Sequence, residues 1–400
     1  MQRGFHLSTR AYKRLLHLSF PVEVLNRDLK LIYTSNLIGS FGDGLYAYLL
    51  PYYMKETLKA NPVEIGILYA LTSLTAALTL LIAGALADKY DRKKIMIAGW
   101  LAWVPAPIIF SVARDWIQMM PGMILWGVWL GGPTSTAYIV TSANKNRLTL
   151  TFTVISSSWS FGYIFSPALG GYMAGKIGMQ AVFYTSFLLY ALAGLILAFM
   201  SSQHAPTSQQ KTSIEPSTIE LLKDKRLISM SAFFASIMFV TMMFRPLVPQ
   251  FLADAYHYGD FEIGVLGSMA FFGSAVLGII LGRVGDKWGK EYALSASMTL
   301  CSVSLIIMLL TGNLYVLMAA FFLAGASYIT WSLMSAIIGP QAPEPIRARW
   351  ISIPQTISMF ASIIAPYVGG VFYSIFLYSP FIVAILAAAA LAILASLEKF

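Results

Sequence analysis

The sequence is dominated by twelve apolar stretches, each about as long as an α-helix that crosses a membrane. They lie near residues 31–53, 62–87, 95–113, 117–140, 149–174, 179–200, 228–252, 262–284, 292–311, 314–338, 350–376 and 379–397. The chain is 58% hydrophobic and only 11% charged, whereas soluble domains carry about 25% charged residues. A soluble fold of 400 residues could not cover so much apolar surface. We therefore predict an all-α integral membrane protein with 12 transmembrane helices.

Lysine and arginine predict the orientation of these helices. If the N-terminus is cytoplasmic, 22 of the 27 Lys and Arg residues lie on the cytoplasmic side. The outside loops then hold only Lys55, Lys59, Arg114 and Lys176, and Arg245 lies within a span. Such an excess of inside charge is typical of multi-pass proteins of the plasma membrane. We expect both termini to be cytoplasmic, and the net charge of +9 to reflect topology rather than a nucleic-acid partner.

The longest polar stretch, residues 201–227, lies midway along the chain. We interpret it as a cytoplasmic linker between two six-helix bundles, at 31–200 and 228–400. The basic segment 1–30 has no long apolar core, so we do not expect it to be a cleavable signal. Part of that segment could be an amphipathic surface helix, or the whole could be a partly ordered cytoplasmic tail.

Short motifs recur at an offset of about half the chain. The loop GALADKYDRKK, which begins at Gly84, is matched by GRVGDKWGKEY from Gly282, 198 residues later. The tripeptide EIG at Glu64 recurs at the same offset, and SPALGG from Ser166 is answered by APYVGG from Ala365. Matches in order at a nearly constant offset predict a duplicated six-helix unit. Transporters with two like-oriented halves bind their substrate near the membrane midplane, between the halves.

The duplicated loop resembles the G-x-x-x-D-[R/K]-x-G-[R/K]-[R/K] motif of the major facilitator superfamily of secondary transporters. That resemblance implies two pseudo-symmetric bundles, transport by alternating access, and a loop that latches the halves together when the site faces outward. The residues that carry it are Gly84, Asp88, Lys89, Arg92 and Lys93 in the first half, and Gly282, Asp286, Lys287 and Gly289 in the second. Asp91 stands where the family usually has glycine. Topology alone would explain the basic residues but not the repeated Gly and Asp.

The stretch GYIFSPALGG resembles the G-x-x-x-G-P-x-x-G-G pattern associated with exporters of the drug:proton antiporter type. Its residues, with their second-half counterparts, are Gly162, Pro167, Gly170, Gly171, Pro366, Gly369 and Gly370. Ser166 replaces the second glycine of the pattern. Small residues and proline allow close packing and a bend in a membrane helix. The stretch therefore favours export, although it could be a packing motif of any transporter with this fold.

Only two ionisable residues lie well inside a predicted span, Asp43 in the first helix and Arg245 in the seventh. A charge at membrane depth is costly and is by default a functional hypothesis. Asp43 lies twelve residues after Leu31, or about 18 Å at 1.5 Å per residue, which is near the midplane. In the family both helices line the central cavity, so the two side chains could approach each other there.

Three interpretations of this pair stay open at the level of sequence. Asp43 could bind and release the coupling proton or bind substrate, since burial and a nearby cation act in opposite directions on a carboxyl pKa. The two residues could instead form a permanent structural pair, or local hydroxyl and amide groups could satisfy Asp43. Arg245 could also anchor an anionic substrate. The fourth predicted helix lacks the arginine that many proton antiporters of the family carry there.

Polar and aromatic residues in the spans give further candidates for the cavity wall. They are Asn36, Ser40, Tyr46, Trp129, Trp159, Tyr328 and Trp331. No histidine lies in a predicted span, and no nucleotide-binding loop is present. We therefore expect no metal, no cofactor and no enzymatic activity.

These observations together predict a monomeric secondary transporter that exports small amphipathic or apolar compounds in exchange for protons. The alternative within the same fold is uptake or facilitated diffusion of a metabolite, such as a sugar or an organic anion. A solute receptor that does not transport is a less favoured alternative. Such receptors usually carry long cytoplasmic signalling segments, and the longest connection between the predicted helices here is residues 201–227.

Overall fold

The computed structural model describes residues 25–144, 147–204, 221, 223–338, 341 and 347–397. Its helices, in chain order, are α2 (Arg27–Ala47), α3 (Leu50–Glu56), α4 (Pro62–Lys89), α5 (Arg92–Trp103), α6 (Pro105–Val112), α7 (Trp116–Trp126), α8 (Gly131–Ser142), α9 (Leu148–Ile177), α10 (Met179–Leu197), α12 (Lys225–Phe244), η3 (Arg245–Leu247), α13 (Val248–Tyr256), α14 (Asp260–Trp288), α15 (Lys290–Leu310), α16 (Leu314–Ala324), η4 (Gly325–Ile329), α17 (Thr330–Ile338), α18 (Arg347–Ile375) and α19 (Ser379–Leu397). Five of the twelve helical segments that the sequence predicts consist of consecutive pieces: α2–α3, α5–α6, α7–α8, α12–η3–α13 and α16–η4–α17.

Nine of these segments, within the described residues, are long and apolar enough to cross a membrane by length and composition. The segments that fall short are α2–α3, α7–α8 and α9. The first carries Asp28, Lys30 and Asp43, and the second is divided into helices of 11 and 12 residues. In α9 the polar side chains of Ser158 and Ser166 are completely buried. Charge, interruption and polar side chains therefore take these three segments out of a count that rests on length and composition.

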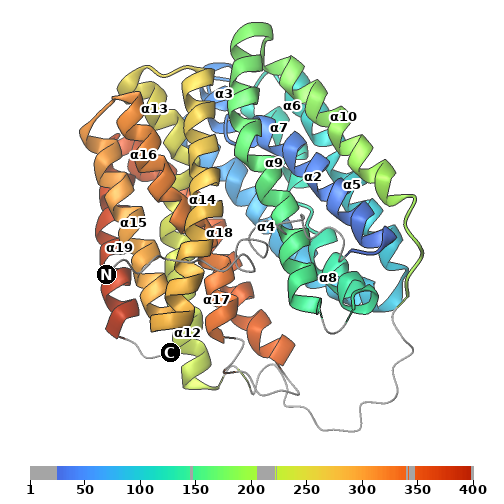
Figure 1. Ribbon diagram of the computed structural model, residues 1–400. Helices are drawn as coiled ribbons and strands as arrows, with labels where there is room; N and C mark the ends of the chain where they lie inside the picture. The colour runs from blue at the N-terminus through green and yellow to red at the C-terminus, as the bar shows by residue number, and fades with distance from the viewer. Residues whose placement is uncertain are drawn as a thin grey trace, which may run out of the picture.

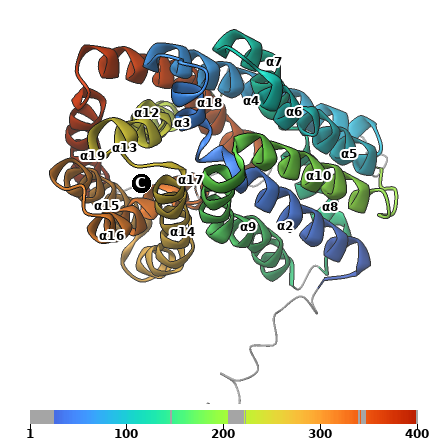
Figure 2. The same cartoon turned by 90° about the horizontal axis from the view of Figure 1, so that it is seen from above.

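The helices lie in two groups side by side, α2–α10 and α12–α19 (Figures 1 and 2). Between the groups, α4 packs against α18 and α9 packs against α14. The predicted limits of the two bundles stay predictions, because most of the tail 1–30 and of the linker 201–227 lies outside the described residues.

The duplication appears in the contacts that join helices within each group. Gly170 of α9 lies so close to α2 that a Cβ there would overlap the carbonyl of Leu45. Gly369 of α18 lies in the same way on the carbonyl of Met243 in α12, which is 198 residues after Leu45. Small residues let membrane helices approach this closely. The repeated Gly-Gly pair thus binds the fifth and eleventh helical segments to the first and seventh.

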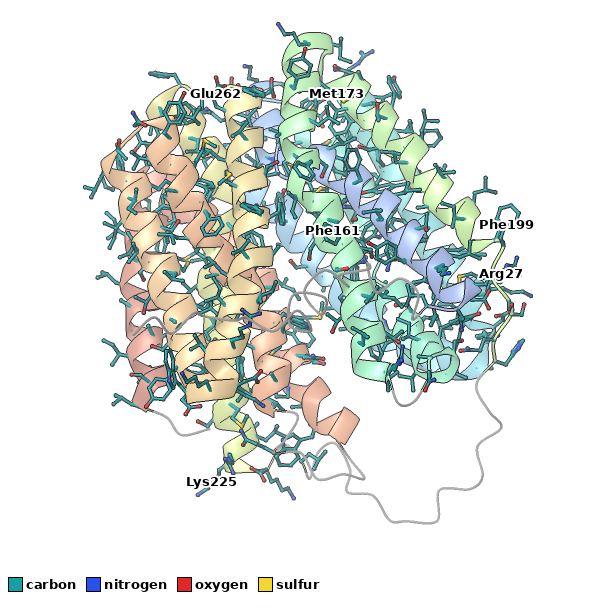
Figure 3. All side chains as sticks on the ribbon, in the orientation of Figure 1. Arg27, Phe161, Met173, Phe199, Lys225 and Glu262 are labelled. Carbon is teal, nitrogen blue, oxygen red and sulfur yellow. The ribbon has the colours of Figure 1, made fainter. Side chains whose placement is uncertain are left out.

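Four other glycines make the closest contacts between the two groups. A Cβ on any of them would overlap a backbone carbonyl of the other half: Gly66 on Pro366, Gly171 on Asp260, Gly264 on Pro167 and Gly370 on Pro62. All four contacts lie at the end of the molecule where α4 and α14 begin. Figure 3 places Glu262 and Met173 at this end and Lys225 at the opposite end. The halves are therefore packed tightly at one end, which the predicted topology makes extracellular.

The two halves lie apart at the other end. The ribbons of α8 and α17 diverge there (Figure 1). At Gly282 of the second loop, no atom of the described neighbouring elements lies within 4 Å of the position that a Cβ would occupy. The structure thus holds the conformation in which the loop between α4 and α5 and its counterpart are separated from the opposite half.

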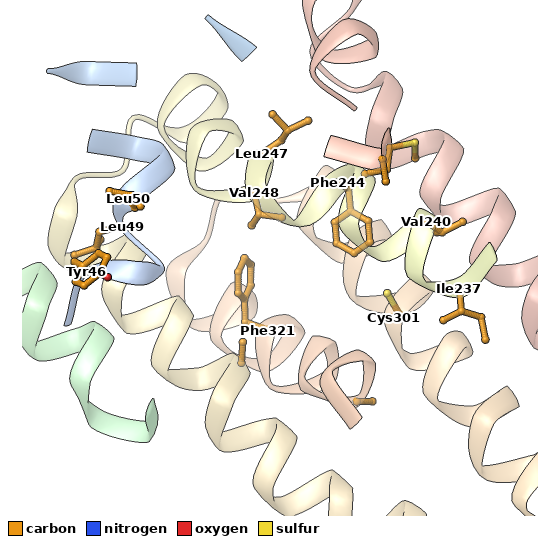
Figure 4. Close-up of a cluster of buried hydrophobic side chains, with 14 of the residues drawn as sticks. Tyr46, Leu49, Leu50, Ile237, Val240, Phe244, Leu247, Val248, Cys301 and Phe321 are labelled. Atoms are coloured by element: carbon orange, nitrogen blue, oxygen red, sulfur yellow. The ribbon is translucent and has the colours of Figure 1, made fainter. Parts of the chain in front are cut away.

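Equivalent glycines also interrupt one helical segment in each half. Gly127 ends α7 against Thr72 of α4, and Gly325, 198 residues later, ends α16 against Ala270 of α14. A third interruption is the 3₁₀ turn at Arg245–Leu247. Figure 4 shows Leu247 and Val248 at this turn among buried apolar side chains. Interrupted helices are typical of the binding sites of transporters, since they bring backbone and polar groups to the midplane.

Candidate functional site

Asp43 lies on a cavity between the two halves. Its side chain projects from the middle of α2 and is only 3% exposed. The cavity has a volume of about 360 Å³ and is also lined by Arg245 from the other half. A carboxyl group that faces such a cavity can meet both a solute and a proton.

Neutral donors hold the Asp43 carboxylate. The indole Nε1–H of Trp126 donates to Oδ1 at 2.7 Å, and the hydroxyls of Tyr163 and Tyr190 donate to Oδ2 and Oδ1. The hydroxyls of Tyr46 and Tyr190 are 2.9 Å apart and share a further hydrogen bond. A tyrosine hydroxyl can accept as well as donate. The same cluster can therefore bind Asp43 whether it is ionised or protonated.

Arg245 lies at the interruption of the seventh helical segment, where Pro246 cannot donate to the helix. Its guanidinium lies 3.9 Å from the ring centroid of Tyr328, a cation–π contact. Its Nη2 donates to Ser327 Oγ at 3.3 Å. A guanidinium has five N–H donors, so most of the donors of Arg245 are left for a ligand in the cavity.

Asp43 and Arg245 share the cavity but do not form an ion pair. Among the described residues, the ion pairs are those of Lys55 with Glu56 and with Asp254. The permanent structural pair considered from the sequence is therefore not present in this conformation. Hydroxyl and indole groups from distant helices hold Asp43, in place of the local hydroxyl and amide groups considered from the sequence.

The rest of the cavity wall is mainly aromatic. Tyr48 and Tyr69 line it from the first half and Phe271 and Tyr328 from the second. The rings of Tyr163 and Phe271 approach to 4.5 Å between centroids and so connect the halves. Such a wall can stack on flat or apolar solutes.

The sequence reasoning did not single out Tyr48, Tyr69 or Tyr190 as site residues. Tyr69 could have been found by counting residues inward from the predicted outer ends of the first two helices. Asp43 lies eight residues before Pro51, and Tyr69 lies seven residues after Pro62 on the next helix. The two residues are thus at similar depth.

The other cavity candidates lie in three different places. Tyr328 lines the central cavity, while Asn36, Trp129 and Trp159 line a separate pocket within the first half. Trp331 is half-buried in α17 and is not among the residues that line either of these.

Ser40 and Tyr46 differ from the expectation, because both are completely buried between helices. Ser40 Oγ donates to the carbonyls of Leu37 and Ser158, at 3.1 and 3.3 Å, and a Cβ at Gly162 would overlap it. The reason is the rotation of α2, whose face with these two residues packs on α9 and α10.

In the first predicted latch loop, Arg92 is bonded to its own half in this conformation. Arg92 is 5% exposed, and its Nη1 donates to Ala137 O at 3.1 Å, Thr141 Oγ1 at 2.8 Å and Gln203 Oε1 at 2.7 Å. These bonds tie α5 to α8 and to the segment that follows α10. The side chains of Gly84 and Asp88 lie outside the described part of the structure.

The remaining loop residues lie at the surface. Lys89 lies 5.5 Å from the ring of Tyr90, and Lys287 lies 5.4 Å from the ring of Trp288. Asp286 is exposed and makes no hydrogen bond to a helix among the described residues. The separation of the halves at this end removes any helix terminus that it could reach.

The departure of Asp91 from the family motif has a local explanation. Asp91 caps α5, its Oδ1 accepting the N–H of Lys93 at 3.0 Å, with φ of −60°. The equivalent Gly289 ends α14 with φ of +122°, a conformation that favours glycine. The two loops thus enter the next helix by different turns, and only the second needs glycine.

Comparisons with known proteins agree with this architecture. The sequence matches the Major Facilitator Superfamily over residues 32–245 and again over 230–398. It is 25% identical over 311 residues to the multidrug resistance protein MdtG of Proteus mirabilis, covering 75% of this chain and 77% of that protein. It is 22% identical over 396 residues to the quinolone resistance protein NorA of Staphylococcus aureus, covering 94% and 97%.

Solved structures show the same fold. A mutant form of the nucleoside transporter NupG superposes with a TM-score of 0.79 at 13% identity, over 94% of this chain and all 100% of that one. A bacterial homologue of the human lysosomal transporter Spinster, in an inward-facing and occupied conformation, gives 0.71 at 16% identity over 97% of both chains. With its two like-oriented halves, its central cavity and these matches, the chain belongs to the Major Facilitator Superfamily and is a multi-pass transporter of the cell membrane.

Proposed function

We propose that the protein exports amphipathic or apolar organic compounds and that protons entering the cell drive this export. Two relatives that cover most of the chain are a multidrug resistance protein and a quinolone resistance protein. The aromatic wall of the cavity suits such compounds, which bind by apolar contact and stacking. We further propose cytoplasmic termini and a monomer as the working unit.

The observation that supports proton coupling is that Asp43 lies on the cavity and is bound only by neutral donors among the described residues. An acidic group at the centre of a membrane helix costs about 2.5–3.5 kcal/mol by insertion scales, so one that persists on a cavity calls for a role. Its partners are neutral, so taking up a proton leaves no unpaired cation behind. A proton and a solute that compete for this site would be moved in opposite directions.

The packing of the halves supplies the second requirement, a site open to one side at a time. Closure at the glycine contacts and separation at the opposite end correspond, on the predicted topology, to a cavity that faces the cytoplasm. Export then requires the halves to rock so that the latch loops meet and the glycine contacts open. The two charged loops lie where such a latch would form.

The test uses purified protein in liposomes with an imposed pH gradient. We expect Asp43→Asn to retain substrate binding but to lose proton-driven accumulation by at least tenfold. The control is Glu56→Gln, which neutralises an exposed acid outside the cavity and should behave like the unaltered protein. If Asp43→Asn still accumulates substrate against its gradient as the pH gradient dissipates, proton coupling at Asp43 is refuted.

A second candidate function is uptake or facilitated diffusion of a metabolite, with an organic anion favoured over a sugar. Arg245 supports it, because this cation makes one hydrogen bond and no ion pair among the described residues. Replacement of Arg245 by Gln should then abolish the flux of carboxylates without a pH gradient. Under the export proposal, the same variant should leave the movement of uncharged compounds within a few-fold of normal.

A further inference from the structure

We propose that a tryptophan-lined pocket inside the first half binds the alkylammonium headgroup of an amphipathic organic cation. This inference rests on the proposed function and names organic cations as one class of its substrates. The pocket is distinct from the central cavity that Asp43 and Arg245 line.

Four tryptophans from three helical segments form this pocket, which we call the tryptophan cage: Trp100, Trp103, Trp129 and Trp159. The rings of Trp100 and Trp103 are 5.5 Å apart, and those of Trp103 and Trp129 are 5.7 Å apart. Trp159 lies 6.1 Å from both Trp100 and Trp129. Nine tryptophans occur in the whole chain, so nearly half of them converge on one pocket.

The surrounding structure fixes the cage in place. The indole of Trp103 donates to Val128 O at 2.6 Å, a carbonyl in the interruption between α7 and α8. The backbone N–H of Trp129 donates to Thr79 Oγ1 at 2.9 Å. A Cβ at position 39 would overlap the Trp100 ring, so Gly39 leaves that ring its place. In a preorganised pocket of this kind, the ordering of side chains on binding costs little free energy.

The chemistry of the cage selects a cation. Its lining residues include no ionisable group, so the faces of the indole rings dominate its field. Those faces are electron-rich, attract ammonium groups and oppose anions. The carboxamide of Asn36 also lines the cage and has no hydrogen-bond partner in the part of the chain that the structure describes. Its oxygen can accept an N–H from a protonated amine.

The size of the cage selects a compact headgroup. Its volume is about 80 Å³, roughly half of the ~150 Å³ of a cavity that holds benzene. A trimethylammonium or dimethylammonium group fits this space, whereas a fused ring system does not. Trp129 is 38% exposed, so the cage is not sealed and the rest of an amphipathic molecule can extend out of it.

Aromatic contacts connect the cage to Asp43. Trp159 stacks on Tyr163 at 6.3 Å and 21° between planes, and the Tyr163 hydroxyl donates to the carboxylate. Trp103 lies 5.8 Å from Tyr190, whose hydroxyl donates to the same carboxylate. A cation in the cage is thus separated from Tyr163 and Tyr190, which hold Asp43, only by the rings of Trp159 and Trp103. Loss of the negative charge on protonation would weaken its binding, which is the competition that exchange requires.

The test is equilibrium dialysis of radiolabelled choline against the full-length protein in a non-ionic detergent. The competitor 3,3-dimethylbutan-1-ol has the same shape as choline without the charge. We expect choline to bind about tenfold more tightly than this alcohol, the size of a partly desolvated cation–π contact. Trp129→Leu should reduce choline affinity about tenfold, and Trp129→Phe by only a few-fold, because phenyl keeps an aromatic face.

Two controls locate the effect. Trp288→Ala removes an exposed tryptophan at the end of α14 and should leave choline binding unchanged. Asn36→Leu should weaken binding of N,N-dimethylethanolamine, which carries an N–H when protonated, by more than it weakens binding of choline. A larger loss with Trp129→Leu than with Asp43→Asn assigns the cation to the cage rather than to the carboxylate alone.

Equal affinity for choline and its neutral isostere, or unchanged choline binding in Trp129→Leu, overturns the cage proposal. Neither result affects pH-driven export of uncharged amphipathic compounds, which is measured separately in liposomes. Absence of that export, with the charge-selective binding intact, overturns the export proposal instead.

Discussion

Asp43 differs from most buried carboxylates in having neutral partners. If a guanidinium held it, protonation would strand a buried cation, which costs several kcal/mol. Indole and phenol donors leave no such charge behind, because the hydroxyls can rotate to accept from the protonated acid. Its charge can therefore change without disruption of the surrounding helices. At the residue scale, this property makes Asp43 rather than Arg245 the candidate for carrying protons.

A second carboxylate, Asp91, has a structural role at the membrane surface. Burial disfavours its ionised form, but hydrogen bonds from Gln203, Ser202 and Lys93 outweigh burial and hold the pKa of Asp91 below its ordinary value. It binds the start of α5 to the segment after α10, next to the bonds of Arg92.

Replacing Asp91 should reveal a pH-dependent contribution to stability. Asp91→Ala should lower the free energy of unfolding by about 1 kcal/mol at pH 7, the typical value of a helix cap. Because the folded pKa lies below the unfolded value of about 3.9, this stabilisation is present above that value and is lost as the pH falls through the folded pKa. Thermal unfolding of the purified protein from pH 7 to pH 3 measures it.

Asp91→Asn provides the control, since asparagine caps helices as well but carries no charge. It should be less destabilising than Asp91→Ala and should show no titration. A difference between the unaltered protein and Asp91→Ala that stays constant down to pH 3 would contradict the assignment.

At the element scale, the closure between halves depends on helix backbones in direct contact. Each of the four glycines faces a carbonyl of the opposite half. Polar contacts also join the halves at this end: Lys55 pairs with Asp254, which also accepts from Tyr373 OH at 2.7 Å, and the N–H of Ala168 donates to Ser268 Oγ at 3.0 Å. Both charged side chains are partly exposed, at 22% and 27%, and such pairs typically contribute 0–1 kcal/mol. Glycine packing should therefore dominate the closure.

Substitution of one glycine should open this end. Gly66→Leu places a side chain where the backbone of Pro366 lies, and overpacking of this kind costs about 1–3 kcal/mol. The closed state should lose population by about 5- to 150-fold relative to the open one. The measurement is the rate of disulfide formation in a Lys55→Cys, Asp254→Cys background, which should fall accordingly.

Gly175→Leu is the matched control, because nothing lies within 4 Å of a Cβ at that position near the same end of the molecule. It should leave the cross-linking rate unchanged. Equal rates in the Gly66 variant and in this control would show that the glycine contact does not determine closure.

At the scale of the whole molecule, the orientation in the membrane decides which solutes the cavity meets first. The segment α5–α6 is a single span and offers a direct test, since Lys94 and Arg114 are exposed at its opposite ends. The single native cysteine, Cys301, is 1% exposed and should not react.

We predict that a membrane-impermeant maleimide labels Arg114→Cys on intact cells and does not label Lys94→Cys. Both variants should be labelled after the membrane is permeabilised. The reverse pattern on intact cells would place the N-terminus outside and would make the glycine-closed end cytoplasmic.

Three features of this protein were determined by the sequence alone: its twelve helical segments, its duplication and its two membrane charges. Each can be recognised along the chain without knowing how the helices pack. Length and apolar content decide whether a segment crosses a membrane, and a repeat is a comparison of the sequence with itself. Even the equivalent interruptions at Gly127 and Gly325 follow the 198-residue offset.

The composition of the site was decided only by the tertiary structure. Asp43 is bound by residues 83, 120 and 147 positions away, and no local pattern marks Trp126, Tyr163 and Tyr190 as its partners. The rotation of each helix about its axis decides this, because adjacent residues point about 100° apart. That rotation buried Ser40 with its neighbours instead of exposing it to the cavity. Close contact of glycine with backbone sets the rotation, and such contact exists only once the helices have packed.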